Sequence, residues 1–80
     1  MTGSSDTRKA EKVFVLYDGR AQSGDTDDAA VLLTVHSLRE AWLDSRDYRK
    51  TGAVWYEYDV VDGEATNERR RDDIGKGILL

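Results

Sequence analysis

Residues 53–61, with the sequence AVWYEYDVV, restrict the possible folds of this chain more than any other segment. Alternate residues fall into two sets, as the two faces of a β-strand would. One set is apolar and the other contains two carboxylates: Val54, Tyr56, Tyr58 and Val60, against Trp55, Glu57, Asp59 and Val61. The following Asp62-Gly63 favours a two-residue type I′ turn, so we expect a hairpin. Its returning strand, residues 64–70 (EATNERR), is polar and suits the edge of a sheet.

The first half of the chain contains a second apolar strand signal and one ambiguous segment. Residues 13–17 (VFVLY) are β-branched and aromatic and predict a central strand. Residues 29–35 (AAVLLTV) suit a strand, or the first half of one helix over residues 28–50. Ser37 and Glu40 match the S-x-x-E capping box, which would have no purpose inside a continuous helix. We therefore expect a strand, followed by a helix over residues 38–50.

These elements predict a single small α+β domain in the order β-β-α-β-β, with a mostly antiparallel four-stranded sheet and one helix on one face. The alternative, one long helix over residues 28–50, gives β-α-β-β. We expect the helix to cover the apolar set of residues 53–61. Trp55 would then lie on the uncovered face and Trp42 in the core. Residues 1–11 are typical of a disordered tail, residues 12–80 form the domain, and a loosely ordered C-terminal tail begins at about residue 72.

Composition excludes several classes of protein. The chain has 80 residues, no Cys and a net charge of −4. Without Cys there is no disulfide or thiolate metal site, which fits a cytoplasmic protein. No apolar run is long enough to span a bilayer. The acidic balance disfavours binding to DNA and to anionic membranes, so we expect no membrane contact and regard nucleic acid as an improbable partner.

Two acidic groups could carry chemistry. Residues 24–28 (GDTDD) offer oxygen ligands for Ca²⁺ but lack EF-hand spacing, and a solvated turn is favoured. Glu57 and Asp59 share a strand face with Trp55, and burial against the indole could raise one pKa for acid–base work. The favoured interpretation is ion pairing with Arg69 and Arg71 of the returning strand.

The remaining polar motifs give no site. His36 is the only histidine and has no triad spacing around it. The run Arg69 to Arg71 could meet phosphates, but acidic residues flank it. Residues 75–77 (GKG) lack the Walker pattern. We therefore predict no catalytic residue, no metal, no cofactor and no enzymatic activity.

The sequence favours a small acidic, non-enzymatic protein-interaction module. Two Trp and four Tyr in so short a chain motivate this hypothesis. Its partner would be another protein or a second copy of the chain. We expect the following residues to contact it: Trp55, Glu57, Asp59, Arg69 and Arg71.

The alternative is a small inhibitor or antitoxin-like protein from a mobile element that occupies a basic, nucleic-acid-binding partner. The strand–strand–capped-helix order resembles small antitoxin-like domains of the HicB type, in topology, over about half of the chain and without a shared motif. Clustering of six aspartates on one surface would favour this alternative: Asp18, Asp25, Asp27, Asp28, Asp59 and Asp62.

Overall fold

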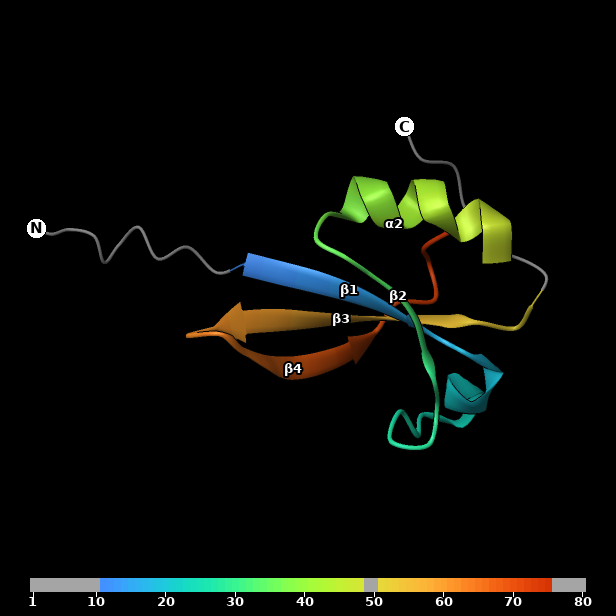
Figure 1. The fold of residues 1–80 in the computed structure, drawn as a ribbon, viewed down its shortest axis with the longest axis horizontal. Helices are drawn as coiled ribbons and strands as arrows, with labels where there is room; N and C mark the ends of the chain where they lie inside the picture. Colours follow the sequence, from blue (N-terminus) through green and yellow to red (C-terminus); the bar gives the residue numbers. More distant parts are fainter. Residues whose placement is uncertain (1–10, 49–50, 76–80) are drawn as a thin grey trace, which may run out of the picture.

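A computed structural model describes residues 11–48 and 51–75 and shows four strands and one α-helix (Figure 1). In chain order the elements are β1 (Glu11–Tyr17), the 3₁₀ helix η1 (Gly19–Ser23), β2 (Val31–Val35), α2 (Leu38–Asp44), the 3₁₀ helix η2 (Ser45–Tyr48), β3 (Val54–Val61) and β4 (Glu64–Arg70). The predicted α+β class and the order β-β-α-β-β are confirmed. The long helix over residues 28–50 is excluded, because β2 occupies its first part.

The four strands form one sheet in the order β2-β1-β3-β4, and every neighbouring pair is antiparallel. As predicted, β1 is central and β4 lies at an edge. The β3–β4 hairpin has positive φ angles at Asp62 (55°) and Gly63 (81°), as the predicted type I′ turn requires. The strand β2 forms the opposite edge of the sheet.

Ser37 begins the helix, as the capping box predicts. Its hydroxyl accepts a hydrogen bond from the backbone N–H of Glu40 at 3.1 Å. The Glu40 carboxylate reaches back one residue further than expected and accepts from the N–H of His36 at 3.3 Å. The α-helix ends at Asp44, well before the predicted residue 50, and the chain continues as the 3₁₀ helix η2. At this junction the Ser45 hydroxyl donates to the carbonyl of Trp42, a local bond that competes with helical pairing.

The helix covers the face of the sheet opposite to the predicted one. Trp55 is 4% exposed and belongs to the main core cluster, together with Phe14, Leu16, Val35, Ala41 and Ile74. Trp42 is only partly buried against this cluster. The prediction that Trp55 lies on an uncovered face, with Trp42 in the core, is therefore wrong. Ile74 falls within the predicted loosely ordered C-terminal tail, but this residue is 5% exposed and packs in the core.

The apolar set of β3 is covered from the other side by η1 and the loop that follows it. Ala21 of η1 is fully buried against Val54 and Tyr56. Figure 1 shows α2 on one side of β1 and β3 and η1 on the other. Both sets of β3 are consequently buried near Trp55, and the strand becomes more exposed toward Val61. This is why uniform apolarity did not identify the helix-bearing face.

The predicted tails fall mainly on residues 1–10 and 76–80, which lie outside the described residues. The first strand already begins at Glu11. Within the described part of the chain, no helix has the length and apolar character needed to cross a bilayer.

Candidate functional site

Four of the five predicted partner-contacting residues meet at the helix-bearing face of the sheet, beyond the end of the core. The β3–β4 register places Glu57 opposite Arg69, and Lys12 of β1 lies opposite Asp59. Asp59 and Arg71 complete an ion-pair cluster, which we define as Lys12, Glu57, Asp59, Arg69 and Arg71. Trp55 is next to it on β3 but lies in the core. The predicted pairing of the two carboxylates with the two arginines is confirmed.

Glu57 is the centre of the ion-pair cluster. Its carboxylate lies 3.1 Å from Lys12 Nζ, 3.0 Å from Arg69 Nη2 and 2.5 Å from Arg71 Nη1, and its side chain is only 8% exposed. Burial by itself would raise the pKa of Glu57, but hydrogen bonds from the three cations outweigh it and lower the pKa to about 2. The favoured interpretation, ion pairing, therefore holds at Glu57, and the acid–base alternative with a raised pKa does not; Glu57 stays ionised at neutral pH.

Asp59 is also held in its ionised form. Its oxygens lie 2.8 Å from Arg69 Nη2 and 3.2 Å from Lys12 Nζ, and they accept a hydrogen bond from Asn67 Nδ2 at 2.9 Å. These bonds, that from Arg69 first, lower the pKa of Asp59. Two carboxylates that both remain ionised cannot supply the general acid of an acid–base pair. The cluster is built to pair charges and to hold β4 against β3.

The basic run is also neutralised within the chain. Arg70 Nε lies 2.7 Å from Asp72 Oδ1, and Arg71 Nη2 lies 2.9 Å from Asp73 Oδ2. Arg70 Nη1 additionally donates to the carbonyl of Gln22 at 2.6 Å. Guanidinium groups engaged in this way offer little of the free positive charge that binds phosphates.

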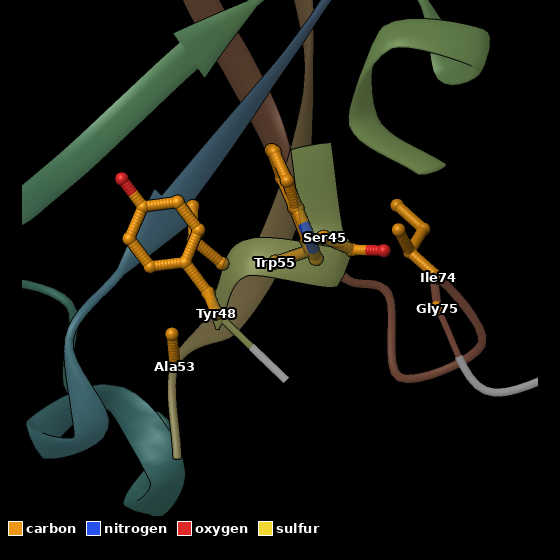
Figure 2. Close-up of a pocket in the computed structure, with 7 residues that line it drawn as sticks. Ser45, Tyr48, Ala53, Trp55, Ile74 and Gly75 are labelled. Atoms are coloured by element: carbon orange, nitrogen blue, oxygen red, sulfur yellow. The ribbon is translucent and has the colours of Figure 1, made fainter. Parts of the chain in front are cut away.

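Trp55 lines a small hollow at the other end of β3. Figure 2 shows its indole between Tyr48 of η2 and Ile74, above Ala53. The hollow has a volume of about 90 Å³. Pockets that enclose drug-sized molecules are commonly about 300–1,000 Å³, and the volume of this hollow is well below that range.

Sequence reasoning missed a second polar cluster on the face that η1 covers. The Tyr58 hydroxyl donates to Glu68 Oε2 at 2.6 Å and lies 2.7 Å from the Tyr17 hydroxyl. Thr26 of the loop after η1 donates to the same Glu68 oxygen at 2.9 Å. Burial and these bonds raise the pKa of Tyr58. The sequence signal for this cluster was the presence of tyrosines on the same face of β1 and β3. The cluster holds the loop against β4.

The aspartates in and near the acidic loop accept hydrogen bonds from the backbone of their own turns. Asp25 Oδ1 accepts from the N–H of Asp27 at 3.0 Å, and Asp18 caps η1 by accepting from the N–H of Arg20. In residues 11–48 and 51–75 no group of three or more His, Cys, Asp and Glu side chains has an arrangement that could hold a metal ion. His36 is exposed, and its backbone N–H donates to Glu40.

The sequence analysis also did not identify the edge strand β2 as a possible binding surface. Its sequence, VLLTV, carries no charge, and it forms one outer edge of the sheet. Val31 is 57% exposed and Leu32 is 39% exposed. The signal was available in residues 29–35, where seven successive residues are uncharged.

Comparison with protein-family models, with curated proteins and with solved structures finds no match for this chain.

Proposed function

We propose that this protein is a small acidic, non-enzymatic protein-interaction module that binds its partner through the β2 edge of the sheet. The observation that carries the proposal is an uncharged edge strand with Val31 and Leu32 exposed. An edge strand presents unpaired backbone N–H and C=O groups, and an added strand can pair with them.

The other edge of the sheet supports this choice by contrast. In β4, the sequence EATNERR contains four charged residues, and the β3–β4 pairing has an irregularity where Asn67 has a positive φ of 54°. Charges and bulges at an edge oppose the addition of another strand. β2 has an irregularity opposite Leu16 and Tyr17, but Leu33, Thr34 and Val35 pair regularly and no charge protects them. The two edges therefore differ in their capacity to accept a strand.

Partner binding by the five residues named in the sequence analysis remains a prediction. The contacts that their side chains make within the chain do not support it. Glu57, Asp59, Arg69 and Arg71 direct their charges at one another, and Trp55 is buried. Breaking such a cluster to bind a partner would leave charges uncompensated. We therefore assign these residues to holding the sheet together.

The alternative function, an antitoxin-like inhibitor of a basic partner, requires a concentrated acidic surface. Four of the six aspartates lie in or beside η1 and its following loop. Asp59 is paired with Arg69 and Lys12, and Asp62 lies in the hairpin at the opposite end of β3. Four of the six thus gather near η1 and two lie elsewhere, so the six do not form the single acidic surface that this alternative requires. We place the protein in the cytoplasm, because a chain with no Cys needs no oxidising compartment.

Site-specific photocrosslinking tests the proposal. A photoreactive amino acid replaces Leu32 of β2 in one sample and Ala65 of β4, also exposed, in a matched control. Each sample is irradiated in an extract of the native host, and the adducts are identified by mass spectrometry. We expect a protein adduct of defined mass at Leu32 that is absent at Ala65. No adduct at Leu32, or the same adducts at both positions, would contradict the proposal.

A further inference from the structure

We infer that the strand accepted by the β2 edge is β2 of a second copy of this chain, paired antiparallel about a two-fold axis. The inference rests on the proposed function and names the partner. A two-fold axis perpendicular to the sheet turns a strand into its own antiparallel neighbour, so that one surface serves both subunits. If the axis passes through Leu33, Val31 lies opposite Val35 of the second copy, and Leu32, which has no partner in the β1–β2 register, lies next to the axis.

Side-chain chemistry along β2 suits this pairing. The five residues VLLTV are apolar or hydroxyl-bearing, so no charge has to be buried between the copies. Val31 and Leu32 would lose exposed apolar surface at the new contact. Cross-strand pairs of β-branched and apolar side chains contribute to the stability of antiparallel sheets.

The charges at the two ends of β2 favour the antiparallel arrangement. Asp27 and Asp28 precede the strand, whereas Arg39 follows it, and all three side chains are exposed. Glu40, in the same turn as Arg39, accepts the N–H of His36. Antiparallel pairing brings the two aspartates of one copy toward Arg39 of the other, whereas parallel pairing would bring like charges together. This charge complementarity favours a copy of the chain as the occupant.

The symmetry also limits the size of the assembly. Two copies joined at β2 form an eight-stranded sheet with both α2 helices on the same face. Its two remaining edges are both β4, whose charges and irregular pairing oppose further addition. The assembly therefore closes at two copies. Because the contact rests mainly on two five-residue strands, it is small, and we expect a weak, reversible dimer with a Kd in the micromolar range or above.

Sedimentation velocity on the purified full chain tests the inference. We expect a monomer–dimer equilibrium between about 10 µM and about 1 mM protein. Leu32→Lys places a charge next to the axis of the contact and should raise the dimer Kd at least about tenfold. Leu43→Lys is the matched control, because Leu43 is similarly exposed (44%) but lies on α2. It should change the Kd much less.

A cysteine scan provides a second readout in this Cys-free chain. Single cysteines are introduced at Leu32, Leu33 and Thr34, with Ala65→Cys as the control on β4. The position nearest the axis should form an intermolecular disulfide rapidly under mild oxidation, whereas the control should not. Equal rates at β2 and β4 would refute the inference.

The two proposals fail in distinguishable ways. A chain that stays monomeric to about 1 mM, or a dimer that Leu32→Lys leaves unchanged, overturns the second-copy inference. If a foreign protein is then crosslinked at Leu32, the β2 edge is still the binding surface and the proposed function stands. If no protein is crosslinked there, both proposals are wrong.

Discussion

Replacing Glu57 by Gln removes one charge from the centre of the ion-pair cluster and changes little else in size or shape. The side chain is almost fully enclosed and contacts three cations, Lys12, Arg69 and Arg71. After the substitution these cations share fewer carboxylates, chiefly Asp59 and Asp73. We expect the variant to fold but to be less stable, since removing one partner of an enclosed ion pair leaves the others undercompensated.

The pKa of Glu57 sets the expected magnitude. Folding lowers it from 4.5 to about 2. At about 1.4 kcal/mol for each pH unit, this difference corresponds to about 3 kcal/mol of stability at neutral pH. Lys12 and Arg69 keep 49% and 38% of their side-chain surface exposed, so solvent screens part of the interaction. We therefore expect Glu57→Gln to lower the free energy of unfolding by about 1–3 kcal/mol.

The pH dependence identifies the cause of the loss. Because the folded pKa lies below the unfolded one, the carboxylate stabilises the fold fully above pH 4.5, and this contribution disappears as the pH falls to about 2. Urea unfolding followed by Trp fluorescence should show the largest difference between parent and variant at neutral pH. The difference should shrink through this window. Glu64→Gln, at an exposed glutamate of β4, is the control. No loss at neutral pH, or a loss independent of pH, would refute the reasoning.

Three further predictions concern stability and can be measured by the same unfolding experiment. Trp55→Ala should cost about 3–5 kcal/mol as a core truncation, and Trp42→Ala should cost less because that ring is only partly buried; the reverse order would restore the original assignment of the faces. Ser37→Ala should cost about 0.5–2 kcal/mol by removing the cap of α2, and an unchanged midpoint would place the start of the helix elsewhere. Tyr58→Phe should cost about 1–3 kcal/mol because its hydroxyl donates to a carboxylate, and more than Tyr56→Phe, whose hydroxyl makes a longer bond of 3.3 Å to Ala21; equal losses would contradict the role of Glu68.

The features that the sequence predicted correctly depend on short-range causes. The turn at Asp62-Gly63 requires positive φ at two adjacent residues, and the cap at Ser37 involves a residue three positions away. The hairpin places Asp59 opposite Thr66, and the same register continued would put Glu57 opposite Glu68. The irregularity at Asn67 shifts the strand by one residue and brings Arg69 opposite Glu57, and the turn alone does not predict this shift. Local rules were sufficient for the order of elements and for four of the five members of the ion-pair cluster.

The assignment of the faces failed because it depends on a long-range contact. The segment between β1 and β2 folds back, so that Ala21 packs against Val54 and Tyr56 far along the chain. Hydrophobic periodicity shows that a strand has two faces, but it does not show which of several segments covers each one. Lys12 was missed for the same reason: it reaches Glu57 through the β1–β3 pairing, which no local pattern predicts.

The ion-pair cluster and the β2 edge are connected through the sheet. Each carboxylate of the cluster ties β3 to a neighbouring strand, because Arg69 comes from β4 and Lys12 from β1. These contacts engage charged residues of β1, β3 and β4. In contrast, β2 contains no charged residue. An edge without charge can accept a strand, whereas the four charged residues of β4 oppose the addition of one. The same distribution of charge that stabilises the monomer therefore determines where a second chain can add.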